Sequence, residues 1–536
     1  GRKASPRQKR LLRSMRVRLQ RVLYYIDIYS PYTHLDCQFQ TKRTRALWEA
    51  LPADERETFN LDVMRIEWQR YIEDIHLPGM RRNVLRDEFA ADTVLPEAPE
   101  EPGVEEARLQ DEDEVQTIPD LVRSAAARFP EVAACEIQRH GEWSILTYAQ
   151  LLEQVERRAA GWQASGLTVG DRIVLVGENG PDWVVSYLSA SFLGATVVPV
   201  CPQTPADEIA RIAVYTRAAA LVATEEHLTS TRADGTWKGL CLDWWTGAPA
   251  GSEAGPTPAP AGPFNEPDID GQMAASIIFT SGVRVDPRGV VLTHENFITD
   301  LLGLSELQRL DSEDHLLSLL PLHHGLEFTG GLLLTLWSGA TTTYFEAPLN
   351  SRRILETIRD RNVTAILAVP RILKILMDRV LRLDGDDGGP QMSVLRQLRL
   401  IVSGGAPLDG DLFDTYARAG LTIHDGYGLT EAGPIVTVTP RGGSRRGSVG
   451  LPLPGVEVRI DGASTDSPDG EGEILVRGPT VMRGYLDRAE LTAQVLRDGW
   501  LHTGDIGRLD ADGYLTITGR RRDLIVTGAG KNVYPA

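Results

Sequence analysis

Cysteine is scarce in this sequence, and the cysteines that occur lie far apart. The 536 residues contain four, at Cys37, Cys135, Cys201 and Cys241. None belongs to a Cys-x-x-Cys pair or to a Cys/His spacing that could ligate zinc, so a structural zinc site is not expected. A disulfide framework is not expected either, because isolated cysteines are typical of reduced thiols in a cytoplasmic protein.

Long apolar runs and an excess of positive charge are absent as well. No run approaches the roughly 20 apolar residues that a membrane-spanning helix needs. The formal net charge of -18 would repel a nucleic acid from most of the surface, which argues against one as the main partner. With 42% hydrophobic and 24% charged residues, the composition is that of a soluble globular chain. Its length predicts about two to four folding units.

Positive charge is concentrated at the N-terminus. Residues 1–26 contain many Lys and Arg and no acid, with Leu11, Met15 and Leu19 at helical spacing, which is the pattern of a basic amphipathic helix. Such a helix can lie on an anionic membrane surface or pack its apolar stripe against its own domain, and the sequence leaves both interpretations open. A second helical pattern follows, so residues 1–90 predict a small, mainly helical domain.

A change of composition marks the next boundary. Residues 91–116 are rich in Pro, Glu and Asp and poor in apolar residues, which predicts a solvated linker. Beyond it, short apolar runs such as "DRIVLVGEN" and "AAALVATEE" alternate with helical segments. This alternation is typical of buried parallel strands joined by crossover helices. We therefore expect an α/β fold of layered, mostly parallel sheets.

The stretch "FTSGVRVDPRGVVLTHEN", residues 279–296, follows the short apolar strand "AASIIF". A turn after a strand can offer backbone N–H groups to an anion, and this stretch also contains Thr, Ser, Gly and Arg. It is not a Walker loop, because no Gly-Lys-Ser/Thr follows Gly282 at the required spacing. On its own, the stretch fits a phosphate-binding loop or an ordinary Gly/Pro turn between two strands.

Further motifs follow in a fixed order. "SGGAP" spans 403–407, "HDGYGLTEAGP" spans 424–434, and "GWLHTGDIGRLDADGYLTITGRRRDLIVTGAGKNVYP" spans 499–535. With "LTYAQLLEQVERRAAGW", "FLGATVVPVCPQTP" and "LPLHHGLEFTGG" upstream, this ordered set resembles the acyl-adenylate-forming superfamily of AMP-binding enzymes over residues 117–536. "PLHHGLE" and "VTGAGKNVYP" are most similar to bacterial long-chain fatty acyl-CoA or acyl-carrier-protein synthetases. The "FDxS" signature of amino-acid-activating domains is missing, which counts against an amino-acid substrate.

This resemblance implies an organisation as well as a fold. Residues 117–518 would form a large adenylate-forming domain, in which the layered sheets are joined by a distorted β-barrel-like subdomain. Residues 519–536 would contain a hinge, at Arg522 and Asp523, and the start of a truncated C-terminal small domain.

A second resemblance covers roughly residues 20–90. "YIDIYSPYTHLDCQFQTKRTRALWEAL" and "FNLDVMRIEWQRYIEDIHLPGMRRNVL" are similar to the C-terminal domain of alcohol-forming fatty acyl-CoA reductases. The dinucleotide-binding half of those reductases, with its glycine-rich fingerprint, does not occur in this chain. We therefore expect a piece of a longer polypeptide, covalently joined to reductase and C-terminal domains, and a fatty acyl substrate.

The chemistry implied by the first resemblance joins two anions. A carboxylate oxygen attacks the α-phosphate of ATP, giving acyl-AMP and pyrophosphate, and the acyl group then passes to CoA or to a carrier-protein thiol. The protein must screen charge and hold the reactants in line, with Mg²⁺ assisting. We expect an ATP-dependent acid–thiol ligase for a medium- or long-chain fatty acid. A degenerate nucleotide- or acyl-binding module without turnover, and an enzyme for aryl or other carboxylic acids, remain alternatives.

The resemblance also assigns roles to individual residues. Thr430 would bond the α-phosphate, Glu431 would hold Mg²⁺, and His324 would lie at the gate between nucleotide and acyl pocket. Asp505 would accept both ribose hydroxyls, with Arg520 at ribose or phosphate. The residues expected around the adenine are Tyr427, which would stack on it, and Gly404, Gly405 and Ala406, which would line it. The loop would contribute Thr280, Ser281, Gly282, Arg284, Arg288 and Gly289. The expected catalytic set is Thr430, Glu431, Arg288 and His324.

The loop departs from the family pattern. That pattern reads Thr-Ser-Gly-Thr-Thr-Gly-x-Pro-Lys-Gly, and Val283, Arg284, Val285 and Arg288 stand at four of its positions here. Val285 replaces a glycine, and a β-branched residue resists the positive φ that glycine permits. Arg288 keeps the charge of the missing lysine, and Arg284 adds another. We therefore expect a loop of altered shape that still attracts phosphate.

Overall fold

The computed structural model describes most of the chain beyond residue 114. The described residues are 115–139, 141–234, 236–244, 247–248, 264–279, 288–345, 350–384, 389–462, 470–520, 525–526 and 532–533. The chain divides into two compact units, 1–94 and 95–536, and all described residues belong to the second. The predictions for the N-terminal helical segment, for most of the linker and for Arg522 and Asp523 therefore lie outside the described residues.

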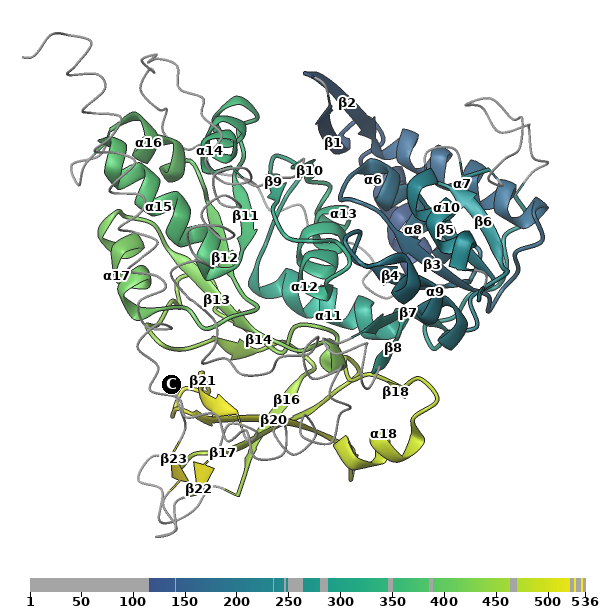
Figure 1. Ribbon diagram of the computed structural model, residues 1–536. Coiled ribbons are helices and arrows are strands. Elements are labelled where there is room, and N and C mark those ends of the chain that lie inside the picture. Colours follow the sequence, from purple (N-terminus) through teal and green to yellow (C-terminus); the bar gives the residue numbers. More distant parts are fainter. Residues whose placement is uncertain are drawn as a thin grey trace, which may run out of the picture. The chain divides into compact units, whose positions relative to one another are not determined.

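The first large sheet has seven strands in the order β18-β8-β7-β4-β3-β5-β6. The strands from β7 through β6 in this order run parallel, whereas β8 and β18 are antiparallel to their neighbours. The parallel strands are short, apolar and buried, as expected where helices cover a sheet. The strand bounds are β3 Arg172–Val176, β4 Thr196–Val200, β5 Ala220–Ala223, β6 Leu240–Asp243, β7 Ala274–Phe279, β8 Gly289–Thr293 and β18 Gly484–Tyr485. The surrounding helices are α7 Tyr148–Ala164, α8 Pro181–Phe192, α9 Ala206–Tyr215 and α10 Glu225–Asp234 (Figure 1).

The second large sheet has nine strands in the order β15-β14-β13-β12-β11-β9-β10-β1-β2. The strands from β13 through β1 in this order are parallel, and short antiparallel strands close both edges. The strand bounds are β1 Ala133–Arg139, β2 Glu142–Thr147, β9 His315–Ser318, β10 Thr341–Tyr344, β11 Ala365–Ala368, β12 Leu400–Ser403, β13 Ile423–Tyr427, β14 Thr437–Val438 and β15 Leu451–Pro452. The helices beside β11–β13 are α14 Ser351–Asp360, α15 Pro370–Asp384, α16 Pro390–Arg396 and α17 Gly410–Arg418 (Figure 1).

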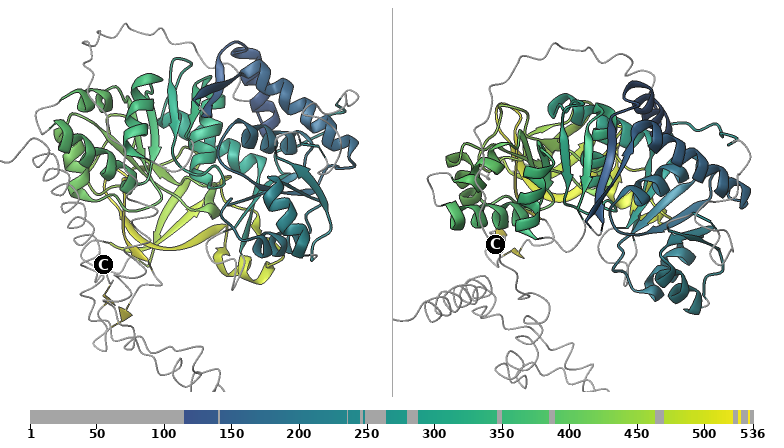
Figure 2. Two further views of the ribbon diagram at one scale, coloured as in Figure 1. Left: turned by 45° about the horizontal axis from the view of Figure 1, so that its top comes forward. Right: turned by 90° about the horizontal axis from the view of Figure 1, so that it is seen from above.

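The third large sheet is an antiparallel half-barrel near the C-terminus. Strands β16-β17-β20-β19 are neighbours in that order, and β21 pairs with β20. The bounds are β16 Glu457–Asp461, β17 Gly472–Arg477, β19 Leu496–Arg497, β20 Trp500–Leu509 and β21 Leu515–Arg520, and the short pair β22 Ile525–Val526 and β23 Asn532–Val533 follows. The yellow strands of this sheet lie along one side of both large sheets (Figures 1 and 2). The prediction of mostly parallel sheets joined by a barrel-like subdomain is confirmed.

An aromatic cluster holds the central helices together. Tyr187 of α8, Phe297 of α11 and Phe328 of η4 are almost fully buried. The ring centroids of Tyr187 and Phe328 are 4.4 Å apart, and those of Phe297 and Phe328 are 5.0 Å apart. The same hydrophobic cluster contains side chains of all three sheets, so one core supports them. Its helices include α6 Ile118–Arg128, α11 His294–Leu307, α12 Gly325–Glu327, η4 Phe328–Leu333 and α13 Leu334–Ser338. None of the helices in the described part of the chain has the length and apolar content that crossing a membrane requires.

One buried hydroxyl in this core gives a test of its stability. The Tyr148 hydroxyl lies 2.8 Å from the Thr335 carbonyl oxygen and 2.7 Å from that of Ala340, and the side chain is 1% exposed. Tyr148→Phe leaves these buried carbonyls short of a donor, so we expect the free energy of unfolding to fall by about 1–3 kcal/mol in urea titrations. Tyr215→Phe is the matched control, because its hydroxyl bonds Leu486 at a half-buried position where water can replace it. Equal losses in both variants would contradict the expectation.

Candidate active site

Two polar turns follow adjacent parallel strands of the nine-stranded sheet. Residues 404–406 come directly after β12, and residues 428–431 come directly after β13. Because parallel neighbours end at the same edge, the two turns lie side by side, where open α/β sheets bind ligands. Gly405 has a φ of +76°, which glycine adopts without strain. Gly405 and Ala406 are both exposed, so this edge presents open backbone.

The carboxylate of Asp505 joins this edge to the third sheet. Asp505 lies on β20, is 5% exposed, and accepts a hydrogen bond from the Tyr427 hydroxyl at 2.7 Å. Its other oxygen lies 2.9 Å from Nε of Arg520, which stands opposite Asp505 in the pairing of β20 with β21. Burial, together with the Asp505 charge, raises the pKa of Tyr427, so this phenol stays a hydrogen-bond donor. Three predicted residues therefore form one connected group.

Glu431 is held in place by a tyrosine from the seven-stranded sheet. Thr430 and Glu431 begin the short 3-10 turn η5, Thr430–Ala432, that follows β13. The Tyr485 hydroxyl of β18 donates to Oε1 of Glu431 at 2.8 Å. The Arg288 guanidinium, one residue before β8, lies beside the same hydroxyl, and burial raises the pKa of Tyr485. The structure thus brings the basic end of the predicted phosphate loop close to the predicted metal ligand.

The two histidines lie on a short loop that leads into α12. The ring centroids of His323 and His324 are 4.5 Å apart. Burial lowers the pKa of His323 to about 4 and also lowers that of His324, so both rings are neutral at pH 7. Asn179 fixes this loop, because its amide donates to the Leu320 carbonyl at 2.6 Å and accepts from the Leu322 N–H at 2.9 Å.

The histidine loop packs directly against both polar turns. A Cβ placed at Gly325 would lie 2.7 Å from Cβ of Pro434, which closes the turn after β13. A Cβ at Gly404 would lie 2.9 Å from Cδ2 of Leu326, so a larger residue here would force the Leu326 side chain of the histidine loop to move. His324, the predicted gate residue, is therefore the neighbour in sequence of Gly325, which packs against Pro434 in the turn after β13.

A buried carboxyl group lies behind the histidine loop. Glu327, the last residue of α12, has no exposed surface, and burial raises its pKa to about 8. At neutral pH this side chain is therefore mostly protonated and adds little negative charge near the site. Asp425 on β13 behaves similarly, since burial raises its pKa to about 7. Because their pKa values are raised, these two carboxyl groups carry less negative charge at neutral pH than ordinary carboxylates, and they repel an anion less.

Several predicted residues cannot be placed at this edge. Thr280, Ser281, Gly282 and Arg284 lie outside the described residues. Gly289 opens β8 and pairs with Phe279, and a Cβ at this position would lie 2.9 Å from Cγ2 of Ile277. Sheet packing alone therefore accounts for this glycine.

Sequence reasoning missed two residues that organise the site. Tyr485 lies in "RGYLD", which has no catalytic pattern, and its partner Glu431 is 54 positions away. Asn179 lies in "GENGPDW", and the Leu320 carbonyl that it holds is 141 positions away. A polar residue three positions after the buried strand β3 was the available signal for Asn179, because the turn that follows β3 also lies at a carboxyl edge.

Comparisons with known proteins agree with this architecture. A family model described as AMP-binding enzyme matches residues 122–486, and one described as male sterility protein matches residues 5–87. A feruloyl-CoA synthase of Amycolatopsis sp is 34% identical over 403 residues, covering 74% of this chain and 78% of that protein. A long-chain-fatty-acid–CoA ligase of Mycobacterium tuberculosis is 29% identical over 448 residues, covering 74% and 73%. The crystal structure of ATP-bound MatB from Rhodopseudomonas palustris has a TM-score of 0.66 at 28% identity, covering 78% of this chain and 81% of that one.

These matches confirm the resemblance carried by the ordered motifs. The AMP-binding match spans more than half of the chain and includes β12, β13, both polar turns and Tyr485. Asp505 and Arg520 lie beyond the matched residues but are joined to Tyr427 by the contacts described above. The chain therefore belongs to the AMP-binding enzyme family.

Proposed function

We propose that this protein activates a carboxylic acid with ATP as acyl-AMP and then transfers the acyl group to the thiol of CoA or of a carrier protein. The observation that carries the proposal is the convergence of Tyr427, Glu431 and Asp505 at one edge of the nine-stranded sheet. Enzymes of this family use ATP and Mg²⁺ with CoA as acceptor, and an ATP-bound structure shares the fold.

The nucleoside end of ATP is proposed to lie on Tyr427 and Asp505. The bonds from Tyr427 and Arg520 hold the Asp505 carboxylate in one orientation. Each carboxylate oxygen has a further lone pair, so both oxygens can still accept a ribose hydroxyl. The exposed residues Gly405 and Ala406 offer the adenine a surface next to the Tyr427 ring.

The phosphate end is proposed to lie between Arg288 and Glu431. Mg²⁺ usually takes one or two carboxylates together with substrate phosphates, and when bound it screens the phosphate charge. Among the described residues no three His, Cys, Asp or Glu side chains converge to hold a metal by themselves. A single carboxylate, Glu431, together with the phosphates would therefore hold the ion, and the Tyr485 hydroxyl fixes the orientation of that carboxylate.

The reaction itself needs positive charge and alignment more than covalent chemistry. A carboxylate oxygen of the acid forms a bond to the α-phosphorus, the bond to the bridging oxygen breaks, and pyrophosphate leaves with the electron pair. The Arg288 guanidinium offers two parallel donors to the phosphates, and Thr430 places a hydroxyl in the same turn as Glu431. The neutral His323 and His324 rings bring no charge toward an apolar acyl chain.

A medium- or long-chain fatty acid is the proposed substrate. This choice rests on the similarity to the long-chain ligase of M. tuberculosis and on the male sterility match at residues 5–87. An aryl acid is the second candidate, favoured by the 34% identity to a feruloyl-CoA synthase. The four replaced positions of the phosphate loop favour a third candidate, a nucleotide-binding module without turnover.

The remaining expectations stay predictions. A cytoplasmic location rests on the scarcity of cysteine, and contact of residues 1–26 with a membrane surface has only the basic amphipathic pattern behind it. Covalent linkage to a reductase and to a C-terminal small domain rests on the two resemblances.

Pyrophosphate exchange with a panel of acids tests the proposal. We expect the complete polypeptide to exchange pyrophosphate into ATP with palmitate-like acids and more slowly with ferulate-like acids. Restoring Thr, Thr and Gly at Val283, Arg284 and Val285 should speed exchange, because donors and backbone freedom return where charge is relocated. Exchange with aryl acids alone would favour the second candidate. ATP binding without exchange for any acid, in wild type and restored loop alike, would leave only the binding module.

The role of Asp505 is tested by ATP affinity. Asp505→Ala removes both acceptors for the ribose hydroxyls, and bonds to a charged group are worth about 1.5–3 kcal/mol each, so we expect ATP affinity to fall about ten-fold or more in calorimetry. Tyr427→Phe is the control variant, because it keeps the aromatic ring and the Asp505 carboxylate and removes only the hydroxyl that donates to Asp505. It should weaken ATP binding less than Asp505→Ala. Unchanged affinity in Asp505→Ala would remove this residue from the nucleotide site.

The role of Glu431 is tested by metal dependence. Glu431→Gln keeps the shape of the side chain and loses its charge, so ATP should still bind while the Mg²⁺ concentration needed for half-maximal exchange rises about ten-fold or more. Tyr485→Phe should cause a smaller rise, since it only frees the orientation of the carboxylate. A Mg²⁺ titration of Glu431→Gln that matches wild type would exclude Glu431 as the ligand.

A further inference from the structure

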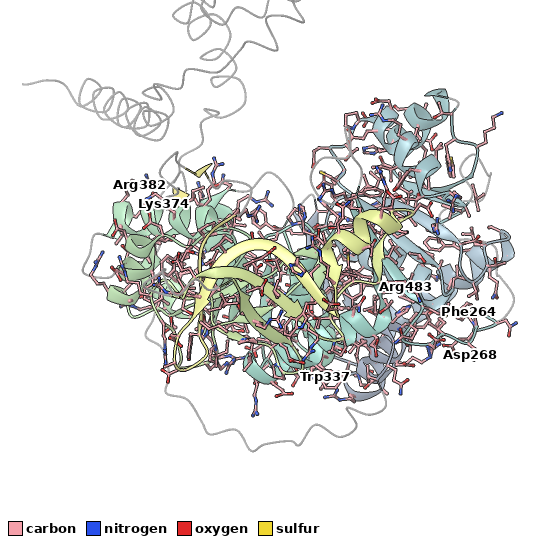
Figure 3. The ribbon with its side chains drawn as sticks, turned by 90° about the horizontal axis from the view of Figure 1, so that it is seen from below. Phe264, Asp268, Trp337, Lys374, Arg382 and Arg483 are labelled. Atoms are coloured by element: carbon pink, nitrogen blue, oxygen red, sulfur yellow. The ribbon has the colours of Figure 1, made fainter. Side chains whose placement is uncertain are left out.

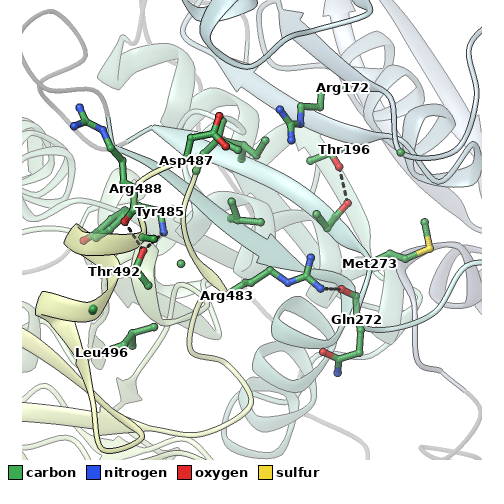
Figure 4. Close-up of a pocket in the computed structure, with 18 of the residues that line it drawn as sticks. Arg172, Thr196, Gln272, Met273, Arg483, Tyr485, Asp487, Arg488, Thr492 and Leu496 are labelled. Atoms are coloured by element: carbon green, nitrogen blue, oxygen red, sulfur yellow. Dashed lines mark hydrogen bonds between the residues drawn. The ribbon is translucent and has the colours of Figure 1, made fainter.

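A hollow of about 1080 Å³ lies between helix α18, Ala489–Val495, and the seven-stranded sheet. It is lined by Arg172, Thr196 and Ala274, which begin β3, β4 and β7. This "α18 hollow" therefore includes the amino ends of the parallel strands, whereas residues 280–287 follow the carboxyl end of β7 in the sequence. Its apolar lining includes Met273 and Leu496, which are labelled in Figure 4, and also Ala274, Ile277, Val291 and Leu486.

The rim of the α18 hollow carries arginines whose charge is not neutralised locally. Arg172 donates to the Thr216 carbonyl at 2.7 Å, and Arg483, labelled beside α18 in Figure 3, donates to the Gln272 carbonyl at 3.0 Å. Within the described parts of the chain, neither side chain forms an ion pair with a carboxylate. A bond to a carbonyl leaves the full positive charge of a guanidinium in place.

The aspartates on the same rim are engaged elsewhere. Asp487 pairs with Arg217 at 2.5 Å. Asp270 accepts from the backbone N–H groups of Gln272 at 2.8 Å and Met273 at 3.1 Å, which orient its carboxylate but leave its charge in place, so it offsets only one of the two arginine charges of Arg172 and Arg483. The rim therefore keeps an excess of positive charge above an apolar floor, which is a combination that favours an acidic segment with some apolar content.

The chain enters the described fold beside this hollow. Val115 is 5% exposed, so packing begins at the first described residue. A Cβ placed at Gly271 would lie 3.4 Å from the carbonyl oxygen of Gln116. Gly271 stands between Asp270 and Gln272, which both line the hollow. The described chain therefore begins next to the positively charged rim.

The segment that precedes Val115 has the complementary composition. Residues 105–114 read "EEARLQDEDE" and contain Leu109 and one arginine, with acids at Glu105, Glu106, Asp111, Glu112, Asp113 and Glu114. Ten residues can reach up to about 33 Å, and a tethered segment has a high effective concentration at a surface beside its own attachment point. The length of residues 105–114, their attachment at Val115 and their negative charge all favour this segment as the occupant of the α18 hollow.

We propose that residues 105–114 dock on the α18 hollow, with their carboxylates at Arg172 and Arg483 and Leu109 on the apolar floor. Single exposed ion pairs contribute little, so the contact depends on several of them and weakens as salt screens them. The docked segment covers α18 and the strand that carries Tyr485. The hollow includes Tyr485, whose hydroxyl holds Glu431, but the proposed docking rests on the charge of the rim and the position of Val115 and not on the ATP chemistry proposed above.

Hydrogen–deuterium exchange of the full chain tests the proposal. The variant E105Q/E106Q/D111N/E112Q/D113N/E114Q removes the charge and keeps the length of the segment. We expect backbone amides of residues 484–496 to exchange about three-fold faster or more in this variant and in wild type at 1 M NaCl. The matched control E97Q/E100Q/E101Q neutralises three acids that precede the proposed docking segment in the same linker, and residues 484–496 should exchange in it as in wild type. Arg172→Gln with Arg483→Gln should reproduce the faster exchange, with the core strands β11 and β12 unchanged.

Several outcomes would overturn the proposal. Equal exchange of residues 484–496 in wild type and in the six-acid variant would show that the segment does not cover the hollow. Faster exchange in the six-acid variant but not in the double arginine variant would place the segment elsewhere. Protection that persists in the six-acid variant and falls on dilution of the protein would identify a second copy of the chain as the occupant.

Discussion

The buried carboxylate of Asp505 is the interaction on which the candidate site depends. It lies on the antiparallel third sheet, and its two oxygens are held by Tyr427 from the nine-stranded sheet and by Arg520 from β21. A buried carboxylate without such partners costs several kcal/mol, so the two sheets fit together only where both partners reach it. The contact joins residues 78 positions apart and ties the third sheet to the strand that precedes Thr430 and Glu431.

A second link completes the site from the seven-stranded sheet. Tyr485 of β18 reaches Glu431, and Arg288 beside β8 lies against the same hydroxyl. The site therefore stands where three sheets meet, and each sheet supplies a different part of the chemistry. The nine-stranded sheet supplies the polar turns, the third sheet supplies the Asp505 carboxylate, and the seven-stranded sheet supplies Tyr485 and Arg288.

Much of the architecture could be predicted from the sequence, because it depends on local patterns. Short apolar runs alternating with helical segments require covered parallel strands, and both large sheets have them. The turn "SGGAP" and the run "HDGYGLTEAGP" each follow a buried strand, so their placement at a carboxyl edge could be inferred. The order of the strands within each sheet could not, since β1 pairs with β10 across about two hundred residues and no local pattern encodes that partner.

The sequence by itself determined which residue types stand in the motifs, including Thr430, Glu431 and Asp505, because those motifs are short and continuous. It also determined that Val283, Arg284 and Val285 stand where the family pattern has Thr, Thr and Gly, while Arg288 keeps the charge of the lysine. Only the tertiary structure decided that Tyr485 orients Glu431 and that Asn179 holds the histidine loop. A hydrogen bond acts over about 3 Å of space and is indifferent to distance along the chain. Such partners are therefore selected by how the sheets pack.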